Sequence, residues 1–176
     1  MQRLLVMTVI GSDRPGLVES LAGLVAAHKG NWLESRMSRL GGQFAGILRV
    51  ALPAEHESAL RGSLKSLSGM GLTVVAQPDE VLPREESGRL SVLEIVGQDR
   101  PGIVRQISQT LAAYGVNVEE LETECSSAAM SGETLFKAHA KLSLPECCDT
   151  VELRQKLERI AEDLIVDLSF QELVRG

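Results

Sequence analysis

Aromatic residues and cysteines are scarce in this chain of 176 residues. Phe, Trp and Tyr together make up 3% of it, which argues against the aromatic platforms on which proteins stack single-stranded nucleic acid. The three cysteines, Cys125, Cys147 and Cys148, form neither an even disulfide framework nor a C-x-x-C metal pattern. We therefore expect a reducing compartment and a cytoplasmic protein.

An excess of positive charge and a long apolar run are also missing. The chain has 18 Lys and Arg against 24 Asp and Glu, a net charge of −6, which is the wrong sign for binding by phosphate neutralisation. No apolar run approaches the roughly 20 residues needed to span a bilayer, and the most apolar helical stretch, 17–27, contains Glu19. We expect no direct nucleic-acid partner, no membrane partner and no signal peptide.

What the chain does contain is an internal repeat. The heptapeptide Ile10-Gly-Ser-Asp-Arg-Pro-Gly16 recurs as Val96-Gly-Gln-Asp-Arg-Pro-Gly102, displaced by 86 residues. The second copy then gains six residues, and the register resumes with Phe44 over Phe136. A duplication with one loop insertion explains this pattern.

Each copy has the periodicity of the same series of elements. Residues 4–10 and 90–96 are apolar, β-branched-rich runs typical of a buried strand, and apolar residues at helical spacing follow each heptapeptide. The order β-α-β-β-α-β is predicted for both copies, which is the ferredoxin-like arrangement. The sequence thus predicts an α+β protein with two such domains in tandem, 1–78 and 89–176, joined by a linker at 79–88.

The repeated heptapeptide also predicts where each first helix begins. Asp13 and Asp99 stand two residues before a proline, so we expect the aspartate to cap the helix and the proline to lie in its first turn. On a purely structural interpretation the aspartates do nothing more, the arginines Arg14 and Arg100 are solvated, and the glycines only satisfy the turn.

The G-x-D-R-P-G turn after an apolar strand, an Ala-Ala pair near the end of the next helix and a following asparagine resemble the ACT domain, a small regulatory module. The resemblance covers nearly the whole chain, twice. It implies a non-enzymatic regulator without a cofactor that binds a small amino acid, such as glycine, at an interface between ACT modules. It also implies control of transcription in glycine metabolism through a protein partner such as a transcriptional activator, and pairing of modules within the chain or in a homodimer.

The resemblance places the amino-acid site at the turn and at the asparagine that opens the second strand. A helix N-terminus exposes unpaired N–H groups that suit a carboxylate, and glycines leave room for a ligand beside the backbone. An aspartate stands where well-known binders have asparagine, so an ammonium contact is expected there. The residues implied are Gly11, Ser12, Asp13, Arg14, Gly16 and Asn31 in the first copy, and Gly97, Gln98, Asp99, Arg100, Gly102 and Asn117 in the second.

Charge is divided unevenly between the copies. Residues 1–78 carry +3 and residues 90–176 carry −7. In the second copy Glu120, Glu122 and Glu124 alternate along a predicted strand and therefore share one face. This pattern suggests a protein-interaction surface, with a solvated acidic face as the alternative.

Two other classes of function compete with a sensor. One is a ligand-free adaptor that binds only protein. The other is a small enzyme of the acylphosphatase type, since that fold class also serves as a catalytic scaffold. Arg14 and Asn31 resemble only superficially the arginine and asparagine on which acylphosphatases depend, because the G-x-V-Q-G-V turn of those enzymes is absent from the sequence.

Metal and redox sites receive little support. His28, His56 and His139 are scattered, and no second ligand stands three or four residues away to complete a metal set. We expect no metal site and no catalytic residue. Cys147 and Cys148 are interpreted as surface or packing residues, with a redox role as the alternative.

Overall fold

The computed structural model describes residues 1–79, 88–127 and 134–173. The chain divides into two compact units, unit 1 (Met1–Pro83) and unit 2 (Arg84–Gly176). Most of the linker expected at 79–88 lies outside the described residues, so the boundaries at 78 and 89 stay a prediction.

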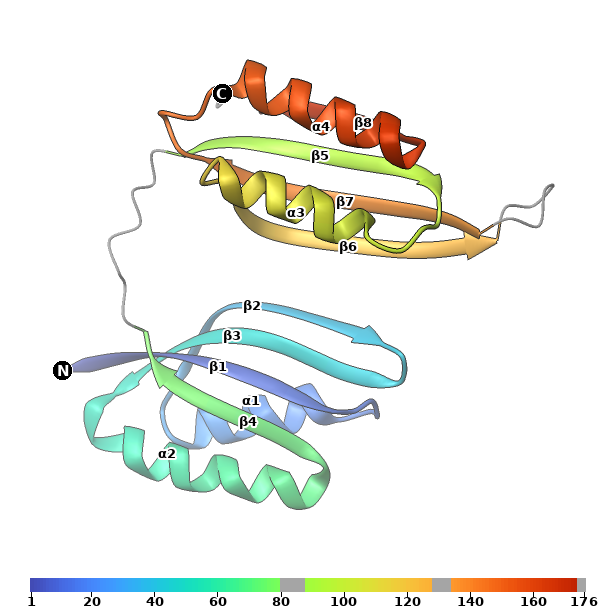
Figure 1. Cartoon of the computed structure of the whole chain (residues 1–176). Helices are drawn as coiled ribbons and strands as arrows, with labels where there is room; N and C mark the ends of the chain where they lie inside the picture. Colours follow the sequence, from blue (N-terminus) through green and yellow to red (C-terminus); the bar gives the residue numbers. More distant parts are fainter. Residues whose placement is uncertain (80–87, 128–133, 174–176) are drawn as a thin grey trace. The chain divides into compact units, whose positions relative to one another are not determined.

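Unit 1 is a four-stranded antiparallel sheet with helices on one face (Figure 1). Its strand order is β2-β3-β1-β4, so β1 lies between β3 and β4. The elements in chain order are β1 (Gln2–Ser12), α1 (Leu17–Ala27), β2 (Asn31–Leu40), β3 (Gln43–Pro53), the 3₁₀ turn η1 (Ala54–His56), α2 (Glu57–Leu64), the 3₁₀ segment η2 (Lys65–Met70) and β4 (Leu72–Pro78).

Unit 2 repeats this topology with strand order β6-β7-β5-β8. Its elements are β5 (Arg89–Gln98), α3 (Ile103–Ala113), β6 (Asn117–Ser127), β7 (Thr134–Leu144), α4 (Thr150–Leu164) and β8 (Val166–Glu172). The prediction of two ferredoxin-like α+β domains is confirmed. Among the described residues, no helix combines the length and the apolar character that crossing a bilayer requires.

The core of each unit lies between the sheet and its helices. In β1 the alternate residues Leu5, Met7 and Val9 are fully buried, because successive side chains of a strand point to opposite faces and one face is covered. Leu17 and Leu21 of α1 pack against them at helical spacing. Unit 2 has its own core, built at the corresponding positions of β5, β7, α3 and α4.

The first glycine of each heptapeptide is required by the sheet. A Cβ atom on Gly11 would lie 2.3 Å from the carbonyl oxygen of Gly71, at the start of the neighbouring strand β4. A Cβ atom on Gly97 would lie 2.6 Å from Cγ1 of Val166, the first residue of β8. Both distances are shorter than real contacts, so any side chain there would push the last strand away from the central one.

We therefore expect Gly11→Ala to lower the free energy of unfolding by about 2 kcal/mol, since the backbone must shift to admit a methyl group. Gly23→Ala is the matched control: the space around Gly23 in α1 is open, and alanine favours a helix interior over glycine by about 1 kcal/mol. Urea denaturation measures both. Equal stability of the two variants would contradict the close approach of β1 and β4.

Candidate functional site

The turn between the first strand and the first helix has the same backbone geometry in both units. The backbone N–H of Asp13 donates to the carbonyl of Gly42, and that of Asp99 donates to Thr134, both at 2.9 Å. Gly16 and Gly102 then take left-handed conformations, with φ of 90° and 98°. Each helix begins at the next residue, so the turn directs the N-terminus of the helix toward the end of the central strand.

The expectation that the aspartates cap these helices is wrong. Gly16 and Gly102 occupy the N-cap positions, and neither helix has a side-chain cap. The backbone N–H of Asp13 bonds to Gly42, and its carboxylate pairs with Arg39 at the end of β2 instead of capping the helix. Pro15 accordingly precedes the N-cap instead of lying in the first helical turn.

The missing caps leave N–H donors at each helix start. In α1 the first backbone hydrogen bond runs from the N–H of Ser20 to the carbonyl of Gly16. In α3 it runs from the N–H of Gln106 to the carbonyl of Gly102. The three N–H groups before Ser20 or Gln106 have no acceptor within their own helix. Together they present partial positive charge, which favours an anionic group such as a carboxylate.

The two aspartates differ in their surroundings. Oδ2 of Asp13 lies 2.7 Å from Nε of Arg39, at the end of β2. The residue of β6 that matches Arg39 in strand register is Cys125. Within the described residues no cation lies at ion-pair distance from Asp99, so its carboxylate is the better acceptor for an ammonium group.

Arg39 was not singled out from the sequence. The Gly41-Gly42 turn gives the signal that would have found it, because a two-residue hairpin loop places Arg39 close to the end of the sheet where β1 finishes. Arg39 thus pairs in unit 1 with a carboxylate whose counterpart in unit 2, Asp99, has no ion-pair partner among the described residues.

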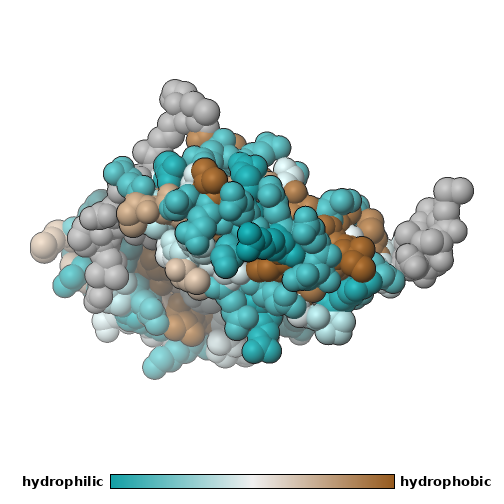
Figure 2. All heavy atoms as spheres, turned by 45° about the horizontal axis from the view of Figure 1, so that its top comes forward, coloured by the Kyte–Doolittle hydropathy of each residue, from teal (hydrophilic) through white to brown (hydrophobic). Residues whose placement is uncertain are grey.

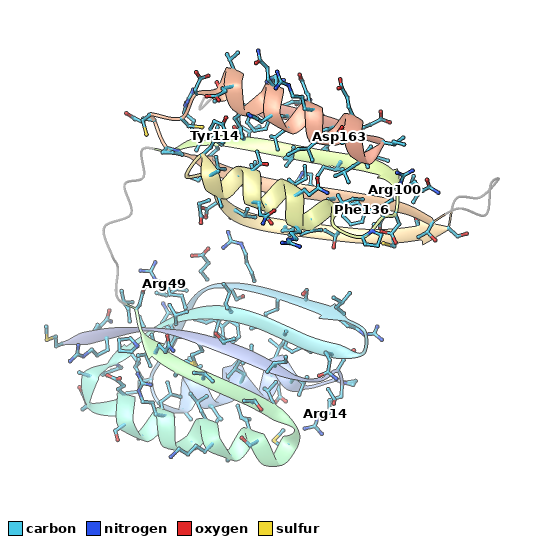
Figure 3. The ribbon with its side chains drawn as sticks, viewed as in Figure 1. Arg14, Arg49, Arg100, Tyr114, Phe136 and Asp163 are labelled. Atoms are coloured by element: carbon cyan, nitrogen blue, oxygen red, sulfur yellow. The ribbon has the colours of Figure 1, made fainter. Side chains whose placement is uncertain are left out.

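The arginines of the two turns also differ. Arg14 donates from Nη2 to the carbonyl of Met70, just before β4, whereas Arg100 donates to Oε1 of Gln98 at 3.2 Å. Figure 3 shows Arg14 and Arg100 near the turn of their respective units. The side chain of Arg14 therefore links its turn to the segment before the last strand of unit 1. The side chain of Arg100 bonds to a residue at the start of its own turn.

The predicted asparagines lie at the other end of the sheet. Asn31 is opposite Ala51 of β3, which is opposite Leu4 of β1, and the turn begins eight residues further along β1, about 26 Å away at the usual rise of a strand. Asn117 likewise pairs with Ser143 at the start of β5, and its side chain donates to Glu119 at 2.6 Å. The turn and the asparagine of one unit therefore do not contact the same small ligand.

The predicted acidic surface lies on the face of sheet β6-β7-β5-β8 that the helices leave uncovered. Glu120 and Glu124 pair across the strands with Lys141 at 2.8 Å and Lys137 at 3.3 Å. Glu122 lies opposite His139. The three glutamates share one face as predicted, but cations of β7 offset part of their charge, and their role in binding a protein stays a prediction.

The histidines and cysteines are not assembled into a site. Nε2 of His28 lies 2.9 Å from Oγ of Ser63, which joins α1 to α2. Across residues 1–79, 88–127 and 134–173 no cluster of three metal-ligating side chains occurs. Burial raises the pKa of the Cys148 thiol, and Arg89 offsets this only in part. The thiolate is thereby disfavoured, which makes Cys148 a packing residue with low reactivity.

The geometry of the turn predicts that Asp13 contributes little to stability. Its ion pair with Arg39 is exposed, and pairs of this kind contribute at most about 1 kcal/mol. Asp13→Ala should therefore change the free energy of unfolding by less than about 0.5 kcal/mol, as measured by urea denaturation.

Asp149→Ala is the comparison, since the carboxylate of Asp149 does cap α4 by accepting hydrogen bonds from the backbone of Val151 and Glu152. Its loss should cost about 1 kcal/mol. A larger cost for Asp13→Ala than for Asp149→Ala would show that Asp13 stabilises its helix after all.

Comparison with known proteins gives the same division of the chain. Residues 3–77 and residues 91–138 each match a family model described as the ACT domain. A curated relative, the glycine cleavage system transcriptional repressor of Escherichia coli (strain K12), is 23% identical over 167 residues, which are 93% of this chain and 86% of the relative.

Two solved structures extend the likeness to the whole chain. The crystal structure of an unknown protein from Galdieria sulphuraria is 31% identical with a TM-score of 0.85, covering 99% of this chain and all of that one. A candidate glycine cleavage system transcriptional repressor, 16% identical, has a TM-score of 0.69 and covers 99% of both chains. The chain therefore belongs to the ACT-domain family and carries two ACT domains in tandem.

Proposed function

We propose that this chain is an amino-acid-responsive regulator that acts through a protein partner in the control of glycine cleavage or related amino-acid metabolism. The match of two ACT domains to a glycine cleavage system transcriptional repressor along 93% of the chain carries the proposal. That likeness supports a regulatory, ligand-binding protein. The ligand, the protein partner and repression of transcription as the direction of control are the parts we propose.

The turn geometry supports a zwitterion as the ligand. The start of α3 offers N–H donors to a carboxylate, and Asp99 offers to an ammonium group a carboxylate that has no ion-pair partner in the described part of the chain. Both charges of a free amino acid thus find partners in one turn, Gly97–Gly102. Unit 2 is the better candidate of the two, since the carboxylate of Asp13 in unit 1 already forms an ion pair with Arg39.

A protein partner is favoured because the chain offers little to DNA. The net charge is −6, and the elements seen in residues 1–79, 88–127 and 134–173 follow the ferredoxin-like order and include no helix-turn-helix pair. An effect on transcription would then pass through another protein. The acidic and lysine side chains of β6 and β7 form one exposed, charged surface available to it.

The proposal predicts saturable binding of a small amino acid to the full chain. Isothermal calorimetry with glycine, alanine, serine and valine as probes measures it, and Asp99→Ala should weaken the binding at least about tenfold by removing the partner of the ammonium group. Asp99 is preferred to Gly102 as the test position, because a side chain at φ 98° would strain the backbone whether or not a ligand binds there.

Asp149→Ala serves as the control, since it removes an aspartate of the same unit that caps α4. It should leave the affinity unchanged. Absence of binding by all four amino acids at millimolar concentration would refute the sensor and favour the ligand-free adaptor.

The proposal also predicts that the purified chain alone does not bind DNA. At physiological salt, an electrophoretic shift assay with promoter fragments from glycine cleavage genes should show no saturable complex up to about 100 μM protein, the weak end of ordinary non-specific affinity. A saturable complex would contradict an indirect mechanism and leave amino-acid binding as a separate question.

A further inference from the structure

The residue between α4 and β8 is Ile165, a β-branched residue in the left-handed conformation with φ 56°. It precedes the residue that pairs with Gly97, and the matching residue of unit 1 is Gly71, which precedes the partner of Gly11 and has φ 75°. Glycine adopts this conformation readily, whereas the Cβ of isoleucine crowds the backbone there. The local backbone of unit 2 would therefore be less strained with glycine at this position.

The side chain of Ile165 also remains in water. Its exposed fraction is 66%, and among the described residues it is not part of the core of unit 2. Burial in the core thus does not compensate for the strained backbone. An apolar side chain that is both strained and exposed is suited to contact with another molecule, because covering it removes apolar surface from water.

A hollow of about 610 Å³ lies beside Ile165, between the end of α4 and the strands β5 and β8. Its apolar lining includes Val96, Val166 and Leu168 as well as Ile165. At roughly 10–15 Å³ for each water-sized group, the hollow has room for about forty of them, far more than the atoms of a free amino acid. An occupant that fills it is therefore a segment of a larger molecule.

Three carboxylates decide the charge of that occupant. Glu158 and Glu162, one turn apart on α4, and Asp167 of β8 belong to the lining. Within the described residues the lining includes no lysine or arginine, and none of the three carboxylates has an ion-pair partner. A positively charged occupant would relieve their mutual repulsion, whereas an acidic one would add to it. In unit 1 the strand position of Asp167 is taken by Thr73, so that charge belongs to unit 2 alone.

The hollow adjoins the turn at which the proposed amino-acid ligand binds. Gly97, the first residue of that turn, belongs to its lining. Figure 3 shows Arg100, in the turn, and Asp163, near the end of α4, toward the same end of unit 2. A partner in the hollow and a ligand at the turn would contact neighbouring parts of one unit, an arrangement through which each can change the affinity for the other.

We propose that the hollow beside Ile165 is the docking surface for the protein partner of this chain, and that the docked segment carries an apolar side chain flanked by lysine or arginine. The inference rests on the proposed control through a protein partner and adds the surface and the chemistry of that contact. Ile165 supplies the apolar contact, and Glu158, Glu162 and Asp167 supply the charge that attracts a basic segment.

The test is fluorescence anisotropy of the full chain with labelled nine-residue peptides as probes. One peptide alternates lysine with leucine, a second alternates glutamate with leucine, and a third alternates lysine with serine. The lysine–leucine peptide should bind at least about tenfold more tightly than either of the others, because it alone supplies both the charge and the apolar contact. Added salt should weaken this binding, since the carboxylates are exposed.

Ile165→Gly is the decisive variant. It removes the apolar side chain and introduces the residue that unit 1 has at this position. It should weaken binding of the lysine–leucine peptide at least about tenfold, and it should keep or raise the midpoint of urea denaturation, because glycine relieves the strain. Loss of binding by a chain that is no less stable distinguishes a docking role from a structural one.

Val151→Ala is the matched control, because Val151 is likewise 66% exposed and lies at the opposite end of α4. Its affinity for the peptide should stay as in the parent chain. A double variant, Glu158→Gln with Glu162→Gln, tests the charge. It should weaken binding about fivefold and reduce its dependence on salt.

The outcomes separate this inference from the amino-acid sensor. Equal binding of the three peptides, or binding by Ile165→Gly that matches the parent chain, would overturn the docking surface and leave the sensor as proposed. Peptide binding that depends on Ile165, in a chain to which no amino acid binds, would support the docking surface and refute the sensor. Peptide binding together with amino-acid binding supports both.

Discussion

The left-handed glycine between the central strand and the first helix is the constraint on which each ACT unit depends. The chain must leave the sheet after Asp13 or Asp99 and start a helix on one face only four residues later. Gly16 and Gly102 make this reversal with φ near 90°, a conformation that costs other residues free energy because of their Cβ. The buried stripe of the helix meets the sheet only after such a turn.

This constraint also determines where a ligand finds donors. Because the glycine is itself the N-cap, no side chain caps the helix, and its first N–H groups remain available. Gly16 has no atom within 4 Å of the position of a Cβ, and Gly102 has only the end of Gln106 nearby. The reversal of the chain and the uncapped N–H donors thus come from the same residue.

Most of the fold was predictable because the same pattern of strands and helices occurs in two copies in the sequence. Repetition of the heptapeptide with matching apolar periods identified the elements, and the strand order follows the ferredoxin-like arrangement. The error at Asp13 and Asp99 has a physical cause, since a local preference for capping yielded to a backbone bond with Gly42 or Thr134, residues far along the chain. Such a long-range bond leaves no mark in the local sequence.

The site was predictable only in part, for a reason of topology. The turn was located correctly at the end of β1, and the site residues were grouped by the family resemblance, although the predicted strand-helix-strand order already implies parallel strands and so places Asn31 at the opposite end of the sheet. Both β1 and β2 pair antiparallel with β3, so they run in the same direction and begin at the same end. The start of β2 is consequently as far from the turn as the length of β1 allows.

The two copies share one backbone topology and differ in the size and charge of side chains at corresponding positions. At three corresponding positions unit 1 has Trp32, Leu48 and Arg39 where unit 2 has smaller or uncharged residues. On the surface, hydrophilic side chains predominate on the face shown in Figure 2, with apolar ones in small groups. The two copies therefore differ in charge beside the turn and in side-chain volume beside the first helix.

Binding of a ligand to the folded chain has a thermodynamic consequence that bears on regulation. A ligand that binds the folded state alone stabilises it by a free energy that rises with the logarithm of its concentration over its dissociation constant. It changes affinity for a protein partner only as far as it prefers the conformation which that partner binds. Stabilisation by the ligand and control of the partner are therefore separate free energies, and only the second one makes the chain a regulator.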